Sequence, residues 1–155
     1  MFAVPKLSQL INSYFYNLEL SFDNRGNLKP YEINIISIEE FRHTYVDAFS
    51  ENERRSELFK CYQKYSDDLS KLITNDFYQW IDGSYVSNKQ NPRDIDIVSI
   101  LHYQDYESNL KILQQNFSSI ASRTKYNVDG YIVVNYPDTH KKHIFTKSDL
   151  SLIHI

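Results

Sequence analysis

The sequence predicts an α+β fold in which helices cover a mixed β-sheet, and three observations support this prediction. Three short apolar segments, Phe77–Asp82, Ile95–Leu101 and Val128–Tyr136, are rich in residues that suit strands. Around them, apolar residues recur at steps of three and four, as in helices that bury one face. The chain of 155 residues and 18.4 kDa also has the length of one domain with a single core.

The composition favours a folded chain without a general attraction for nucleic acid. Hydrophobic residues make up 41%, with 13 Tyr and 9 Phe, while 3 Gly and 4 Pro argue against disorder. Because the formal net charge is -3, a nucleic-acid partner would need a local basic strip. No segment reaches the ~18 apolar residues of a membrane span and no signal sequence is evident, so we expect a cytoplasmic protein without a membrane partner. The single cysteine, Cys61, is expected to be a buried, inert thiol.

The N-terminal part predicts a β-hairpin. Apolar and polar residues alternate from Tyr16 to Phe22, which is typical of a half-buried strand. Asp23–Asn27 is a turn, and Tyr31, Ile33 and Ile35 then alternate with polar residues. We expect the second alternating segment to return beside the first.

Two helices are predicted before the first central strand. Ser37 and Glu40 have the spacing of a capping box, and a helix of about three turns follows with Ile38, Phe41, Tyr45 and Phe49 on one side. Ser50 to Glu53 repeats the capping signal, and the apolar steps then continue to about Thr74. The charged residues that begin this second helix are expected to be a solvated first turn: Glu51, Glu53, Arg54 and Arg55.

The second half of the chain predicts strand, loop, strand, helix and strand in that order. The strands are the three segments named above, and the helix between the last two carries Tyr106, Leu110, Leu113, Phe117 and Ile120 on one face. The tail from Pro137 to Ile155 is basic and contains histidine before it becomes apolar. We interpret its end as a final strand or a partner-binding edge.

The most informative stretch lies between the first two central strands. Gly83 and Ser84 follow the first strand, and Asp94 and Asp96 open the second. Because side chains alternate along a strand, the two carboxylates project from the same face. Two adjacent acids repel unless a cation lies between them, and Mg2+ prefers carboxylate oxygens. The Gly-Ser turn offers main-chain N–H groups and a hydroxyl to phosphate oxygens, so the stretch predicts a metal and phosphate site.

This arrangement resembles the polymerase-β-like nucleotidyltransferase superfamily. The matching pattern is Gly83-Ser84 after an apolar strand, a loop of nine residues, Asp-Ile-Asp-Ile at 94–97, and an acid on a later strand. Gly26–Pro30 and Ser37–Phe41 extend the similarity to a little-characterised group of small bacterial proteins assigned to that superfamily. The resemblance covers roughly Gly26 to Asn135. It implies a minimal nucleotidyltransferase fold over 1–155, with an extension at about 1–36, a catalytic core at about 37–136 and a tail at 137–155.

The resemblance also implies roles for individual residues. Asp94 and Asp96 would coordinate two Mg2+ ions, and Gly83 and Ser84 would hold the terminal phosphates of a nucleoside triphosphate (NTP). Asp129 would be the third carboxylate, completing the metal site and helping an acceptor hydroxyl to lose its proton. The hydroxyl would then attack the α-phosphate, and pyrophosphate would leave.

For several of these residues the sequence leaves an alternative open. Asp129 starts an otherwise apolar strand, where an unpaired buried acid is costly, but it could also be a strand-end acid that faces water. Lys89 and Arg93, on the loop between the two halves of the motif, could contact phosphate or be solvated. Asp82 could face the site or pair with Arg93.

The two histidines of the tail are interpreted differently. His140 and His143 have a three-residue step that can suggest a metal site, but no structured carboxylate or cysteine partner accompanies them in the sequence. We expect a solvated or substrate-facing basic loop instead.

The functional hypothesis is therefore a Mg2+-dependent transfer of a nucleoside monophosphate from an NTP to a hydroxyl of a protein, an RNA or a small molecule. Larger members of the superfamily have a helical domain after the core, and only the short tail remains here. A second chain, either another copy or a different protein, could supply that wall. By resemblance, small members include toxins and antitoxins. The alternatives are a non-catalytic binding or antitoxin module with the same fold, and an interaction domain whose acids lie far apart.

Overall fold

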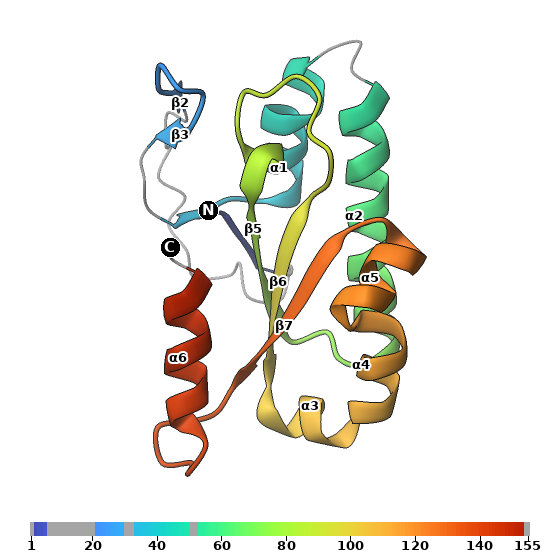
Figure 1. Ribbon diagram of the computed structural model, residues 1–155, viewed down its shortest axis with the longest axis vertical. Helices are drawn as coiled ribbons and strands as arrows, with labels where there is room; N and C mark the ends of the chain where they lie inside the picture. Colours follow the sequence, from blue (N-terminus) through green and yellow to red (C-terminus); the bar gives the residue numbers. More distant parts are fainter. Residues whose placement is uncertain (1, 6–20, 30–32, 50–52, 154–155) are drawn as a thin grey trace.

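A five-stranded mixed sheet runs through the centre of the structure, a computed structural model that describes residues 2–5, 21–29, 33–49 and 53–153 (Figure 1). The strand order in this sheet is β4-β1-β5-β6-β7. A separate two-stranded hairpin is formed by β2 and β3. The bounds of the strands are β1 Phe2–Pro5, β2 Ser21–Phe22, β3 Leu28–Lys29, β4 Asn34–Ile35, β5 Phe77–Asp82, β6 Asp96–His102 and β7 Asp129–Asn135.

The three long strands fix the register at the predicted site. Strand β5 is antiparallel to β6, and β6 is parallel to β7. Asp82 is paired with Asp96, and Asp96 is paired with Asp129. Because residues directly opposite one another share a face of the sheet, three aspartates lie side by side at one end of it.

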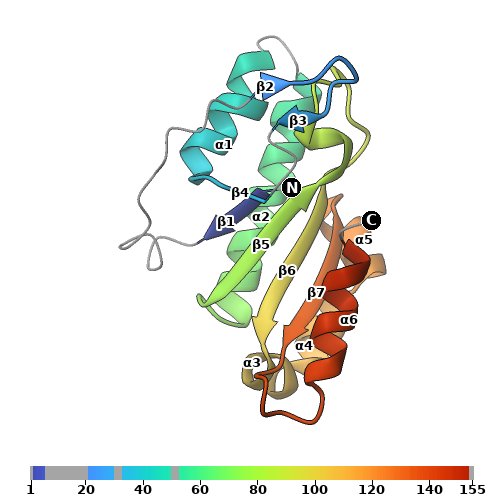
Figure 2. The same cartoon turned by 90° about the vertical axis from the view of Figure 1, so that its left-hand side faces the viewer.

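The helices lie on both faces of the sheet. Figure 1 shows α2, α4 and α5 to the right of the long strands and α6 to their left, and the turned view of Figure 2 has α6 in front of β7. The α-helices are α1 Ile38–Tyr45, α2 Glu53–Leu72, α3 Tyr103–Ser108, α4 Leu110–Phe117, α5 Ser119–Tyr126 and α6 His143–Ile153, and the short 3-10 turns are η2 Asp47–Phe49 and η3 Gly83–Val86. No described helix combines the length and the apolar character that a membrane span requires.

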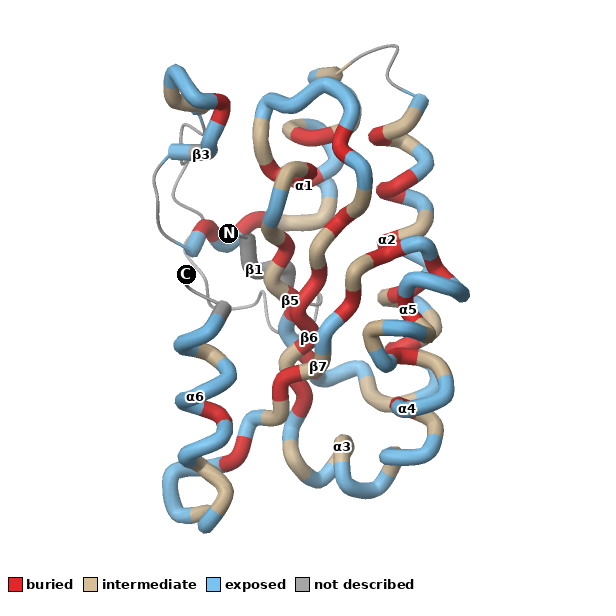
Figure 3. Tube along the Cα trace, in the orientation of Figure 1, coloured by how far each residue is buried: buried red, intermediate tan, exposed pale blue. Residues whose placement is uncertain are grey.

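The core lies between the sheet and the helices α2, α4 and α5, and buried positions cluster on α2 and on the central strands (Figure 3). Tyr65 of α2 packs edge-on against Phe117 and Tyr126, with ring centroids 5.4 Å away in both cases, and so joins α2 to α4 and α5. Each fully buried Leu or Phe side chain contributes about 1.5–3 kcal/mol to such a core. Cys61 packs against this core but is only half-buried, whereas we expected full burial.

Local signals explain where the first helix begins. The hydroxyl of Ser37 accepts a hydrogen bond from the N–H of Glu40 (3.1 Å), and the Glu40 carboxylate accepts one from the N–H of Ser37 (2.8 Å). The predicted capping box is therefore confirmed. The helix directs Phe41 and Tyr45 into the core. The cap proposed at Ser50 lies outside the described residues.

The α+β class is confirmed, and the first central strand has the predicted bounds, but the helix expected between the last two strands is three helices. The first break is at Asn109, whose φ of -120° and ψ of 18° are not helical. The second is at Ser118, which is extended and caps α5 by accepting the N–H of Ala121. Both residues bond readily to nearby backbone, which competes with helix continuation.

Two predictions for the ends of the chain were wrong in the described part. The end of the tail forms helix α6 and not a strand. The predicted hairpin is present, because β2 and β3 pair in antiparallel on the two sides of the expected turn, but the segment expected to return, Tyr31–Ile35, instead contributes β4, which pairs with β1 in parallel. The reason is a tight turn in which Asp23 accepts the N–H groups of Arg25 and Asn27, so pairing starts immediately after Asn27. The predicted strand residues 16–20 lie outside the described part.

Candidate functional site

Four carboxylates gather where strands β5, β6 and β7 meet. The strand register places Asp82, Asp96 and Asp129 next to one another, and Asp94 precedes β6 by two residues. The main-chain N–H of Asp129 donates to the carbonyl of Ile95 (2.9 Å), between the two aspartates of the motif. The backbone of the sheet therefore holds these side chains close together.

An open cavity of about 420 Å³ lies over these acids. Its volume is within the range of small-molecule sites. The residues that line it are Ser84, Lys89, Arg93, Asp94, Asp96 and Asp129. The structure therefore brings together the residues predicted from the sequence, with acids on the floor and cations from the loop.

Gly83, the remaining predicted residue, makes room for a carboxylate. Its φ is 76°, which L-residues with a side chain rarely adopt. A Cβ atom built on Gly83 would lie 1.9 Å from Oδ2 of Asp96. The left-handed φ therefore favours glycine, and a larger residue there would also displace the Asp96 carboxylate.

The electrostatics of the site are dominated by negative charge. Burial, followed by the neighbouring carboxylates of Asp94, Asp129 and Asp82, raises the pKa of Asp96 to about 6, although Arg123 acts to lower it. The raised pKa shows that nearby positive charge does not fully compensate the ionised form of Asp96. A bound cation would supply that charge.

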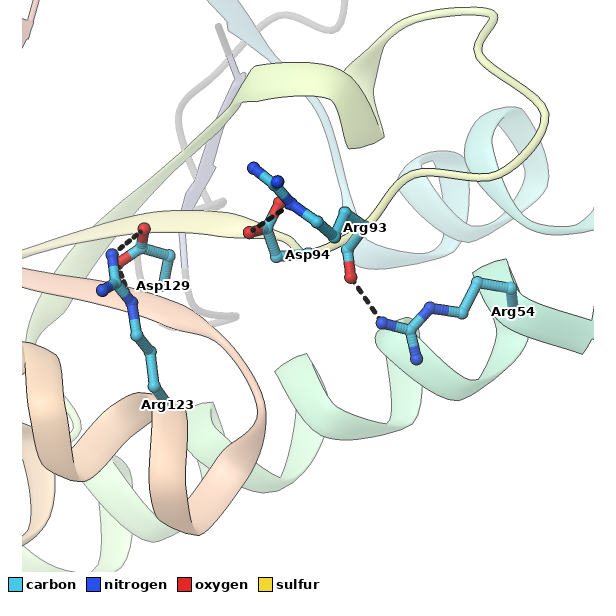
Figure 4. A network of polar contacts seen from close by, with 5 residues as sticks. All are labelled: Arg54, Arg93, Asp94, Arg123 and Asp129. Carbon is cyan, nitrogen blue, oxygen red and sulfur yellow. Dashed lines mark hydrogen bonds and ion pairs between the residues drawn. The ribbon is translucent and has the colours of Figure 1, made fainter.

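Asp129 already has a cationic partner. Nε and Nη2 of Arg123 lie 3.2 and 2.6 Å from the two carboxylate oxygens of Asp129, a bidentate pair shown in Figure 4. The Asp129 side chain is only 13% exposed. Within the described residues, no three His, Cys, Asp or Glu side chains converge in an arrangement that would hold a metal ion.

Arg123 was not predicted from the sequence. It lies in the last turn of α5, and Asn127 reverses the chain with a left-handed φ of 57°. This tight reversal brings Arg123 back to Asp129, six residues later. A basic residue in the last helical turn, followed by Asn and a short strand that starts with an acid, is the signal that could have predicted the pair.

The loop between the two halves of the motif is held by two arginines of α2. Arg54 donates to the carbonyl of Arg93 (Figure 4), and Arg55 bonds several loop carbonyls. Arg55 has 0% exposure, so the prediction that it belongs to a solvated first turn was wrong. Its guanidinium is buried because the loop folds over it. Glu53 is exposed as expected, and Glu51 lies outside the described residues.

The side chain of Arg93 is 90% exposed, and its Nε lies 3.7 Å from Asp94. The sequence left open whether Asp82 pairs with Arg93. In the structure Arg93 pairs with Asp94, whereas Asp82 lies beside Asp96. Lys89 is also exposed. Both cations can therefore be reached by a ligand in the cavity.

The histidines of the tail belong to the opposite end of the sheet. The His140 ring packs on Tyr103 and Tyr136, with centroids 4.9 and 4.8 Å away. His143 Nδ1 lies 2.7 Å from the carbonyl oxygen of Tyr136. The loop is exposed as expected at Pro137–Thr139 and at Lys141, whereas its two histidines lie in protein contacts.

A family model described as a family of unknown function (DUF6932) covers residues 20–149, which include the hairpin, the loop and all the residues that line the cavity. No curated protein and no solved structure gives a significant match.

Proposed function

We propose that this chain, which belongs to the family of unknown function DUF6932, is a Mg2+-dependent nucleotidyltransferase with a minimal nucleotidyltransferase fold. The observation that carries the proposal is the shared cavity. Residues predicted from two separate stretches of sequence, around Ser84 and Asp94 and around Asp129, line the same hollow. This convergence argues against the hypothesis of a coincidental acidic strand end, which requires the acids to lie far apart.

The donor set fits a divalent cation. Asp94 and Asp96 would hold the metal, because both line the cavity and the raised pKa of Asp96 reflects burial and uncompensated negative charge. Asp129 would join them when Arg123 exchanges its partner. Bound Mg2+ would neutralise charge on the triphosphate and on the leaving pyrophosphate.

The loop residues would position the nucleotide. Ser84 follows the left-handed Gly83 and lines the cavity, so its hydroxyl can donate to a phosphate oxygen. Lys89 and Arg93 are exposed cations that line the same cavity and can pair with the remaining phosphate charge.

In the proposed reaction one P–O bond forms and one breaks, so that atoms and charge balance. The oxygen of an acceptor hydroxyl forms a bond to the α-phosphorus, and the bond from the α-phosphorus to the bridging oxygen of the β-phosphate breaks. Pyrophosphate leaves, and the hydroxyl proton passes to a carboxylate, for which Asp129 is our candidate. The acceptor is a hydroxyl of a protein, an RNA or a small molecule.

The test uses each NTP labelled at the α-phosphate, incubated with the full chain, Mg2+ and a cell lysate. We expect metal-dependent label on an acceptor, its loss in Asp94→Ala, and its retention in Asp149→Asn, which removes an exposed acid of α6. Label that persists in Asp94→Ala, or no transfer from any NTP, would contradict the enzyme proposal.

A second candidate, a non-catalytic module that binds a nucleotide or acts as an antitoxin, is favoured by one observation. Arg123 holds Asp129 in a bidentate pair and so occupies the proposed third ligand. This candidate predicts NTP binding without transfer. It also predicts that Arg123→Gln, which releases Asp129, produces no transfer.

A further inference from the structure

We propose that Arg55 is a positioning residue that holds the loop from Tyr85 to Lys89 in the shape that binds phosphate, without touching the ligand. This inference rests on the proposed function, because it assigns the loop a role in nucleotide binding. The residue was not among those predicted for the site. It is also the largest fully buried side chain among the described residues.

The contacts of Arg55 are concentrated on one segment. Its guanidinium donates to the carbonyl oxygens of Tyr85 (2.8 Å), Ser87 (2.8 Å) and Lys89 (2.5 Å). A further bond reaches the carbonyl of Tyr45 (3.1 Å), at the end of α1. One side chain therefore links the loop to two helices.

Aromatic rings enclose the same guanidinium. The centroid of Phe49 lies 3.8 Å from Cζ of Arg55, and that of Tyr85 lies 5.1 Å away. The Tyr85 hydroxyl donates to the main-chain carbonyl of Arg55 (3.0 Å). Burial raises the pKa of Tyr85, so this hydroxyl stays protonated as the bond requires. Tyr85 and Arg55 thus hold each other in place.

The chemistry of this contact is specific to arginine. A guanidinium has five N–H donors in a planar fork, whereas a lysine ammonium is a compact, strongly hydrated charge. Burying a cation is costly unless its donors are satisfied, so a hydrophobic residue would be the simpler way to fill this space. The free-energy cost of burying the guanidinium is consistent with a need for one side chain to hold several loop carbonyls at once.

The bonds to Arg55 also set the direction of the loop peptides. A trans peptide has its N–H opposite its C=O, so the N–H groups of Val86, Asn88 and Gln90 point away from Arg55. The N–H of Asn88 accordingly donates outward, to the carbonyl of Gly26 (3.0 Å). The three peptide groups whose carbonyls bond Arg55 are thereby held in one orientation. They lie in the same loop as Ser84 and Lys89, which line the cavity.

The hairpin turn holds the loop from its other side. Gly26 has a φ of 83°, and a Cβ atom there would lie 2.1 Å from Oδ1 of Asn88. Both the left-handed turn and the close contact therefore require glycine. The loop lies between two supports, Arg55 inside and the Gly26 turn outside, and the two can be removed separately.

The experiment compares the full wild-type chain with Arg55→Lys and Gly26→Ala. Hydrogen exchange measures the amides of 84–90, and calorimetry measures Mg-ATP affinity and, separately, Mg2+ affinity. Arg42→Lys makes the same substitution at an exposed arginine of α1 and is the control for the Arg-to-Lys change itself. Thr146→Val, at the far end of the sheet, is the control for a general loss of stability.

We expect both loop variants to accelerate exchange in 84–90 while the amides of β5 and β6 remain protected. Mg-ATP affinity should fall by roughly tenfold or more, with little change in Mg2+ affinity, because several loop hydrogen bonds are lost and the acids are retained. Unchanged loop exchange in Arg55→Lys, or an equal loss of protection across the whole sheet, would overturn the inference.

The exchange result also separates this inference from the proposed function. If the wild type binds no NTP, the nucleotidyltransferase proposal fails and the assigned binding role of Arg55 fails with it. Selective loss of loop protection in Arg55→Lys with unchanged Mg-ATP affinity would overturn only the positioning role, because the loop would then not determine binding.

Discussion

The polar groups at the two ends of strand β7 differ in how fully they are paired. At its C-terminal end, the Thr146 hydroxyl donates to the carbonyl of Val134 (2.8 Å) and accepts the N–H of Tyr136 (2.9 Å). At its N-terminal end, Asp129 lies beside Asp96 in a cluster of like charges under an open cavity. The first arrangement fastens α6 to the sheet. The second has excess negative charge that the fold alone does not require, and this difference directs the functional proposal to the acid end.

The largest stability effect is expected for Gly83→Ala. The new methyl group would collide with Asp96 and the backbone would keep an unfavourable left-handed φ, so unfolding free energy should fall by about 2–4 kcal/mol. Chemical denaturation measures this change. A fully stable Gly83→Ala would show that the close approach of Asp96 is not important.

Thr146→Val tests the opposite end. It preserves the shape of the side chain but leaves a main-chain carbonyl and an N–H without this partner, which should cost about 1–3 kcal/mol of unfolding free energy. Mg2+ affinity, measured by calorimetry, should not change. A weaker Mg2+ affinity in this variant would contradict the separation of the two ends.

Asp96→Asn tests the charge excess through its pH dependence. The pKa of Asp96 is about 6 in the folded chain and near 3.8 when unfolded, so ionisation destabilises the native state. The contribution of Asp96 to stability should therefore be fully present below about pH 4 and be lost as the pH rises through about 6. We compare the unfolding free energy of the variant with that of wild type at each pH. Between pH 4 and pH 7.5 this difference should shift in favour of the variant by about 1–2 kcal/mol, with allowance for solvent screening. Denaturation curves at both pH values test this, and a pH-independent difference would contradict it.

Arg123→Gln should have the smallest effect on stability. The pair with Asp129 is solvent-exposed on the arginine side, so the midpoint of thermal unfolding should barely move. Mg2+ affinity should rise modestly, because Asp129 becomes available as a ligand. A weaker Mg2+ affinity would instead indicate that Arg123 supports the site.

Local patterns explain how far the sequence could predict the fold. The capping box at Ser37 and the apolar strand Phe77–Asp82 depend on neighbouring residues, and both were predicted with their positions. The tail was misassigned because its apolar residues fit a strand as well as a helix, and the choice depends on Thr146 reaching β7. The pairing of β4 with β1 joins distant segments and has no local signal.

The same distinction applies to the site. The acids and the Gly-Ser turn carry a spacing pattern, so the sequence could place them together. Arg55 belongs to no such spacing pattern, and an arginine in the first turns of a helix is typical of a solvated position. Its burial depends on a loop 30 residues further along the chain that folds over it. The pair of Arg123 with Asp129 similarly depends on the reversal at Asn127.

Calorimetric titration of the full chain with Mg-ATP and the other NTPs is the decisive test of nucleotide binding over the acidic cluster. We predict Mg2+-dependent binding of at least one NTP that is lost in the double variant Asp94→Ala plus Asp96→Ala and kept in Asp149→Asn. Absence of NTP binding by the wild type, or binding that the double variant leaves unchanged, would contradict the account.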